Sequence, residues 1–276
     1  MTNTLAAALN EVIAHTDLAA RLAVDPVQWP RRYRSADDRE VAAWLSSTLA
    51  FGRAEGFGAV LAALFSYADT RGGPAALCDE MTAADREAVG NLSWRWTRGS
   101  DLVQAAVAVG RVRREASSLE AVAGGGSAAS ALSRLVAALV SATGNPVNAL
   151  PHGLRALWPS PVDGSACKRG LLFLRWVVRP EDGVDLGLWT SLTTRDLLVP
   201  VDTHLGRVAR FLGFTKRKVN DWRTAEEITD ALRQIDPVDP VRFDFALTHL
   251  GMSGDCRGYR VAHICPSCPL EPWCQA

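Results

Sequence analysis

The chain has 276 residues, and its 30 Lys and Arg balance its 30 Asp and Glu, so the formal net charge at pH 7 is zero. This composition allows one large globular domain or two modest ones and excludes a strongly basic or strongly acidic protein. No run of 18 or more apolar residues is free of charges, which argues against a membrane span. The N-terminus lacks the basic and apolar regions of a secretory signal, so we expect a cytoplasmic protein.

Helical periodicity runs through the N-terminal half of the chain. Apolar residues recur at three- and four-residue spacing from Asp38 to Phe65, and the stretch Phe51-Gly52-Arg53 predicts a break between two helices there. Two further amphipathic helices are predicted over 101–114 and 127–141, separated by three consecutive glycines.

The C-terminal half shows the same spacing in four segments: 169–178, 202–212, 224–234 and 241–250. Pro180 ends the first of these helices, and Gly213 is expected to cap the second. Thr224 and Glu227 have the spacing of a capping box that opens the third. Because alternating strand patterns are scarce, the predicted fold class is all-α.

Basic residues recur between Lys168 and Arg223, whereas acidic residues gather elsewhere, for example between Asp79 and Glu87. This distribution fits either a set of solvated helix faces or a binding surface for a polyanion. Charge alone does not separate these two interpretations.

Four cysteines lie within the last 21 residues: Cys256, Cys265, Cys268 and Cys274. Thiolates at such short spacing suit a soft metal centre, either zinc or a cubane iron–sulfur cluster. Zinc sites commonly pair two short-spaced cysteine pairs, whereas this segment has one such pair and two isolated thiols, which favours the cluster. Disulfides are less expected in a chain of this length without a secretory signal, and we expect Cys78 and Cys167 to be free thiols.

Asp202 follows an apolar, proline-containing strip at the predicted start of a helix. The simplest interpretation is an N-cap aspartate, and the helix macrodipole favours a carboxylate at this position. A carboxylate held at a rigid helix start is equally well placed to stabilise a cation or to activate a nucleophile.

The stretch Val201-Asp202-Thr203-His204, followed by an Arg-Val pair, together with Cys-x2-Cys-x5-Cys near the C-terminus, resembles endonuclease III and its relatives. These are helix-hairpin-helix DNA glycosylases that carry a [4Fe–4S] cluster. The resemblance implies that Asp202 is the catalytic carboxylate and that the four clustered cysteines hold the cluster. Eight residues separate Cys256 from the next cysteine, which is longer than the usual gap in that family.

The hairpin of that family is similar to the segment from Gly164 to Leu171. Lys168 occupies the position of the nucleophile of the bifunctional enzymes, although it is also readable as a surface lysine near a helix start. Ala166 stands where the family has a second glycine, and the Pro-Gly entry of the hairpin is missing. The segment between Lys168 and Asp202 is also longer than usual in that family, and the extra part corresponds to about residues 180–198.

The resemblance implies a base-excision glycosylase that acts on a flipped base in double-stranded DNA, with or without an abasic-site lyase activity. It implies a cytoplasmic monomer, associated with the nucleoid when bound to DNA. The DNA contacts that we expect come from Ser165, Arg169, Arg207, Arg257 and Arg260. Tryptophans at helical spacing are expected in the core, and Trp94-Arg95-Trp96 is the best candidate for stacking on a base.

The expected architecture has two helical domains with a catalytic cleft between them. The first spans 31–195 and includes the degenerate hairpin near 160–178. The second combines 1–30 with 196–276, and carries the catalytic aspartate and the cluster loop. Two alternatives stay open: a non-catalytic iron–sulfur protein that binds DNA on the same scaffold, and a zinc-stabilised interaction module.

Overall fold

The computed structural model describes residues 4–146 and 149–276, and within these ranges it contains helices and two isolated bridges but no β-strand. The predicted all-α fold is confirmed. The helices of the first half are α1 (Leu5–His15), α2 (Leu18–Leu22), α3 (Ala36–Leu49), α4 (Ala54–Thr70), α5 (Pro74–Asp79), α6 (Ala83–Gly90) and α7 (Gly99–Ala116). Those of the second half are α8 (Leu119–Ala123), α9 (Ala128–Ala142), α10 (His152–Leu157), α11 (Lys168–Val178), α12 (Thr203–Phe211), α13 (Trp222–Arg233) and α14 (Asp244–Met252).

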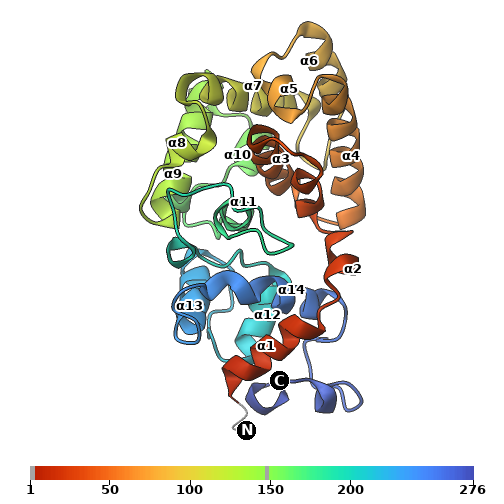
Figure 1. Cartoon of the computed structure of the whole chain (residues 1–276), viewed down its shortest axis with the longest axis vertical. Helices are drawn as coiled ribbons and strands as arrows, with labels where there is room; N and C mark the ends of the chain where they lie inside the picture. Colours follow the sequence, from red (N-terminus) through yellow and green to blue (C-terminus); the bar gives the residue numbers. More distant parts are fainter. Residues whose placement is uncertain (1–3, 147–148) are drawn as a thin grey trace.

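The helices form an upper and a lower group in Figure 1. The upper group holds α3 to α10, and α11 packs on α3 and α9 at its base. In the lower group α12 packs on α14, and the N-terminal helix α1 returns to contact α14 as well. Both ends of the described chain therefore lie in the lower group. The proposed domain boundaries themselves stay predictions.

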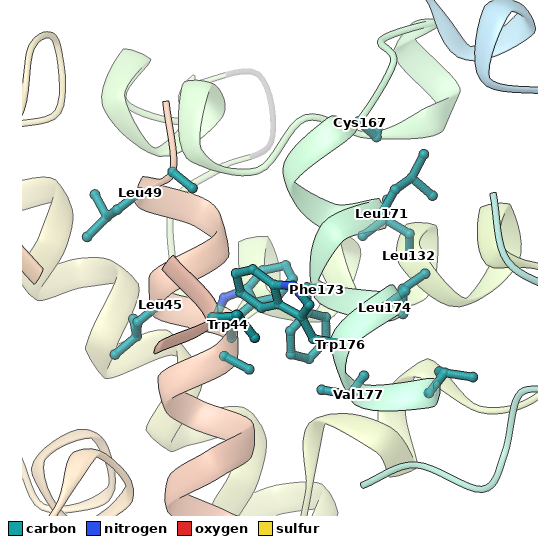
Figure 2. Packing of buried hydrophobic residues seen from close by; sticks show 14 of the residues in the cluster. Trp44, Leu45, Leu49, Leu132, Cys167, Leu171, Phe173, Leu174, Trp176 and Val177 are labelled. Carbon is teal, nitrogen blue, oxygen red and sulfur yellow. The ribbon is translucent and has the colours of Figure 1, made fainter. Parts of the chain in front are cut away.

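Aromatic side chains lock α11 against α3 in the centre of the upper group (Figure 2). The ring of Phe173 meets Trp44 edge-on at a centroid distance of 5.0 Å and meets Trp189 edge-on at 5.2 Å. These two tryptophans and Trp176 are at most 4% exposed, so the expectation that they belong to the core is confirmed. Edge-to-face aromatic pairs contribute about 0.5–1.5 kcal/mol beyond burial of their area. The result is a rigid platform from which α11 projects its first turn.

The predicted helix boundaries hold at most positions. Gly52 has a φ of +84° in the break between α3 and α4, a conformation that favours glycine. The predicted capping box of Thr224 and Glu227 is wrong, because α13 begins earlier and is capped by Asp221, whose carboxylate accepts from the Thr224 N–H at 2.9 Å. Thr224 instead donates its hydroxyl to the carbonyl of Val219.

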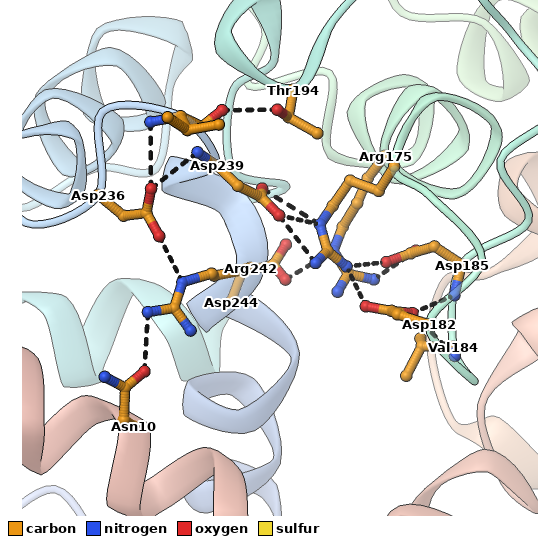
Figure 3. Close-up of polar contacts among 12 residues, drawn as sticks. Asn10, Arg175, Asp182, Val184, Asp185, Thr194, Asp236, Asp239, Arg242 and Asp244 are labelled. Carbon is orange, nitrogen blue, oxygen red and sulfur yellow. Dashed lines mark hydrogen bonds and ion pairs between the residues drawn. The ribbon is translucent and has the colours of Figure 1, made fainter.

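The long segment after α11 is held by buried ion pairs (Figure 3). Arg175 contacts Asp185 of this segment at 2.9 Å and Asp244 of α14 at 2.7 Å. Arg179 also pairs with Asp185, and contacts Asp239 at 2.9 Å. Losing one partner of a buried ion pair costs about 3–5 kcal/mol, because the other charge stays buried without compensation. The network therefore fixes α11 relative to α14.

Candidate active site

A cavity of about 500 Å³ lies where α11 of the upper group faces α12 and α14 of the lower group. Lys168 and Asp202, the two predicted catalytic residues, both line it. Its volume is within the range of small-molecule pockets, roughly 300–1,000 Å³. The other groups around it come from the α3–α4 connection, the chain before Val27, and α14.

Asp202 is the N-cap of α12. Its Oδ1 accepts hydrogen bonds from the backbone N–H groups of His204 at 2.9 Å and Leu205 at 2.8 Å. Among the described residues, no protein donor contacts the other carboxylate oxygen. The amide of Asn220 donates to the Asp202 carbonyl at 2.9 Å, and both residues line the cavity. The carboxylate is thus fixed through one oxygen, and the second stays available to a ligand.

Lys168 opens α11 directly after the hairpin. Gly164 has a φ of +71° and Cys167 a φ of +45°, so the two left-handed residues of the turn flank Ala166 instead of including it. The hydroxyl of Ser165 accepts from the Cys167 N–H at 3.2 Å and closes the turn. The segment before α11 therefore turns tightly without a glycine at position 166, and its assignment as a hairpin stays a prediction. A non-glycine residue in this conformation stores about 1–2 kcal/mol of strain.

The guanidinium of Arg169, a predicted DNA contact, has partners inside the protein. It donates to the carbonyls of Thr48 at 2.7 Å and of Ala156, which lie in the last turns of α3 and α10. It also lies over the ring of Phe51, 4.9 Å from the centroid. Burial lowers the pKa of Arg169 to about 10. A cation at a helix C-terminus is favoured by the macrodipole, so this arginine caps two helices beside Lys168.

Arg207, also predicted to contact DNA, is used inside the protein as well. It donates to the carbonyls of Gly251 at 2.9 Å and Cys256 at 2.8 Å, and so ties α12 to the end of α14 and to the first clustered cysteine. Arg257 and Arg260 are exposed beside the cysteine loop, as a DNA contact would require. Arg260 pairs with Glu271, which partly neutralises it.

The four clustered cysteines surround one small cavity of about 40 Å³, and all of them are free thiols. Val208, Leu212 and Leu250 complete its apolar wall. Burial raises the pKa of the Cys268 thiol, and the three neighbouring thiols raise it further. Burial therefore favours the neutral form of the Cys268 thiol in the protein without a bound ion.

No three His, Cys, Asp or Glu side chains among residues 4–146 and 149–276 come close enough to bind a single metal ion. The thiols share a cavity nonetheless, and a four-iron cluster holds its ligands further apart than one zinc ion does. Four cysteine thiols are a donor set that both zinc and an iron–sulfur cluster use. Cys78 and Cys167 are buried elsewhere, as expected.

A cation–aromatic column stands at the edge of the cavity. The rings of Phe51 and Trp96 stack at 4.9 Å and 18°, with the Arg95 guanidinium 4.7 Å from the Trp96 ring. Trp94 fixes the turn by donating its indole N–H to the Phe51 carbonyl at 2.7 Å. Trp96, the exposed member of the segment named for base stacking, is 43% exposed.

Sequence reasoning missed the polar floor of the cavity. Arg175, Asp244 and His249 are each at most 4% exposed and line it together with Asp25. The His249 ring lies against Phe245 at a centroid distance of 4.4 Å. No local motif marks these residues, since they meet only in the folded chain.

The scarcity of lysine is a second feature of the sequence that points to the cavity. Only three of the 30 Lys and Arg are lysines: Lys168, Lys216 and Lys218. One lines the cavity, and the other two lie on the connection between α12 and α13, which reaches the cavity through Asn220.

A family model described as protein of unknown function (DUF2400) matches residues 25–253. No curated protein and no solved structure matches the chain. In the described ranges, no helix has the length and apolar character needed to cross a membrane. The matched span contains every residue that lines the cavity except Val24 and ends before the first clustered cysteine. Since the match covers well over half of its length, the chain belongs to the DUF2400 family.

Proposed function

We propose that this DUF2400 member is a DNA glycosylase that receives a flipped base in the cavity between α11, α12 and α14 and excises it. The observation that carries the proposal is that Lys168 and Asp202, 34 residues apart in the sequence, line the same cavity. A nucleophilic amine and a carboxylate on one pocket are the groups that this reaction needs. The resemblance to endonuclease III, drawn from sequence motifs, assigns these two residues the same roles.

Asp202 would stabilise the positive charge that develops on the sugar ring as the base departs. Its hydrogen bonds to the first turn of α12 hold it in place before the reaction, so little reorganisation is needed. Flipping costs a few kcal/mol of unstacking, and the apolar and polar walls of the cavity would offset that cost by contacting the base.

Lys168 would act as the nucleophile. Its neutral amine attacks the sugar C1′ as the bond to the base breaks, and the electron pair leaves on the base, which takes up the proton that the amine loses. The C1′–O4′ bond then opens to give the Schiff base, with O4′ taking up a proton. Loss of a C2′ proton from this Schiff base expels the 3′ phosphate by β-elimination. Arginine cannot do this chemistry because its guanidinium stays protonated. In a chain that uses arginine for nearly all its cations, a lysine at this position is therefore informative.

Cys256, Cys265, Cys268 and Cys274 would hold a [4Fe–4S] cluster, with zinc as the alternative. Bound there, the group would supply a rigid centre for a loop that has only short turns of its own. Arg207 anchors that loop to α12, and the exposed Arg257 would then face the phosphate backbone. The partner would be double-stranded DNA, bound by a monomer.

The test is borohydride trapping on a duplex with one abasic site, followed by an excision screen over lesion-containing duplexes. Wild type should give a covalent adduct, and Lys168→Arg, which keeps the charge but lacks the amine, should give none. Arg86→Lys, the reverse exchange at an exposed position on α6 away from the cavity, is the matched control and should trap like wild type. Excision without any adduct would leave Asp202 as the activator of water. The proposal would be refuted if wild type gave no excision of any base and no covalent adduct.

A second candidate is a non-catalytic iron–sulfur protein that binds DNA. It is favoured by one observation, that the hydrogen bonds of Asp202 are fully explained by capping α12. This candidate predicts duplex binding that is unaffected by Asp202→Asn and no excision of any base.

A further inference from the structure

We infer that Lys216 and Lys218, on the loop between α12 and α13, bind the phosphate backbone of the duplex whose base enters the cavity. This inference rests on the proposed function. It concerns a surface that the resemblance to endonuclease III did not assign, and its argument comes from the contacts and charges of the loop itself.

The loop is held rigidly from within. Arg210 donates to the carbonyl of Arg217 at 2.6 Å and to the side-chain oxygen of Asn220 at 2.5 Å. The hydroxyl of Thr224 donates to the Val219 carbonyl at 2.7 Å. Because these inner groups satisfy the backbone, the loop needs no contribution from its two lysines, and it presents both of them in a fixed place.

The same loop is joined to both halves of the candidate active site. Ser165 of the hairpin forms an isolated bridge with Asp221, the residue that ends the loop. Asn220 donates to the carbonyl of Asp202 and lines the cavity. A strand that places a base in the cavity must therefore pass close to this loop.

The exposed charge of the loop is positive. Arg217 is paired with Asp221, so its charge is largely cancelled. Lys216 and Lys218 are exposed, and neither forms an ion pair within residues 4–146 and 149–276. The exposed carboxylate of Glu227 on α13 accepts from the hydroxyl of Thr215 in the loop at 2.6 Å, and one carboxylate does not balance two ammonium groups.

Two apolar side chains on these segments are also exposed, Val162 at 84% and Val219 at 58%. Cations next to small apolar groups suit the phosphates and sugars of a nucleic-acid backbone.

The presence of lysine instead of arginine at these two positions also supports a phosphate contact. Apart from Lys168, the rest of the chain uses arginine for its cations, for example in the buried ion pairs of Arg175 and Arg179. Lysine is a compact, flexible point charge that binds phosphate without demanding one geometry. Two of the three lysines fall within one loop beside the cavity, which matches sequence-independent contact with a backbone.

Lysine acylation read by mass spectrometry tests this directly, because the chain has only three lysines to assign. The full-length protein is labelled alone and with a duplex that carries a tetrahydrofuran abasic-site analogue. We expect at least several-fold slower acylation of Lys168, Lys216 and Lys218 in the complex. Protection of Lys168 without protection of Lys216 and Lys218 would overturn this inference and leave the proposed function standing. No binding and no protection at all would overturn the proposed function with it.

Salt dependence gives a second measurement on folded variants. Each phosphate contact contributes about 0.9 to the slope of log affinity against log salt, so Lys216→Gln with Lys218→Gln should reduce the slope by about 1.8. The charge-matched control is Arg86→Gln with Arg114→Gln, exposed on α6 and α7 at the far end of the molecule (Figure 1). The control should keep the wild-type slope. Equal slopes for all three proteins would refute the loop as a phosphate site.

Discussion

Asp202 has two candidate roles, helix cap and catalytic carboxylate, and two substitutions at this position separate them. Asparagine caps helices about as well as aspartate, so Asp202→Asn keeps an oxygen acceptor for the N–H groups of His204 and Leu205. Alanine removes the acceptor altogether. The asparagine variant thus loses the charge with little loss of the cap, whereas the alanine variant loses both.

The expected magnitudes are far enough apart to measure. Losing the cap costs about 1 kcal/mol, which lowers the melting temperature of a protein of this size by about 2–4 °C. Losing only the favourable charge–dipole interaction costs about 0.3–1 kcal/mol. Removing a preorganised electrostatic group that acts on the transition state costs about 3–4 kcal/mol, or a rate decrease of roughly 10²–10³-fold.

The assay pairs thermal unfolding with single-turnover excision on the best lesion duplex found in the screen. Asp202→Asn should unfold within about 2 °C of wild type while losing at least about 100-fold in excision rate. Asp202→Ala should show the same loss of rate together with the lower melting temperature. Excision within about three-fold of wild type in the asparagine variant would show that Asp202 is only a cap.

Two further outcomes follow from the cysteine loop and from the cap of α13. Cys265→Ser should abolish visible absorbance and most of the bound iron, whereas Cys78→Ser, at a buried thiol outside the cluster, should keep both; colourless wild-type protein with bound zinc would contradict the first expectation. The hydrogen bond from Arg217 lowers the pKa of Asp221 to about 2, below its ordinary value of 3.8. The stabilisation is therefore present above pH 3.8 and lost as the pH falls toward 2. Urea unfolding at pH 5 and pH 3 should show a smaller loss of stability for Asp221→Asn than for wild type, and equal losses would contradict the assignment.

Sequence reasoning succeeded where the determinants are local. The bounds of α11 follow from apolar spacing and Pro180, and Asp202 opens α12 because its own side chain caps the next residues. The prediction of a capping box at Thr224 was wrong because a stronger local cap lies nearby. Asp221 offers a carboxylate three residues earlier, and α13 begins directly after it.

The internal partners of Arg169 and Arg207 were not foreseen because they are distant main-chain groups. Arg169 binds the carbonyl of Thr48, 121 residues away, and Arg207 binds carbonyls more than 40 residues away. A carbonyl leaves no trace in the amino-acid sequence, so an arginine that caps a distant helix has the same pattern as one that awaits a phosphate. For the same reason, the sequence did not indicate that Arg175, Asp244 and His249 line one cavity.

The long segment between α11 and Asp202 is folded back on α11, so its length does not move Asp202 away from Lys168. The N–H groups of Leu186 and Leu188 donate to the last carbonyls of α11 at 2.7 Å, so the chain folds back on the helix it has just left. Asp185 then pairs with Arg175, whose other partner, Asp244, begins α14. Since Arg175 also lines the cavity, the anchor of the extra segment and the floor of the site are one structure. The separation of Lys168 and Asp202 is consequently set by this buried network and by the packing of α11, and the number of residues between them has little bearing on it.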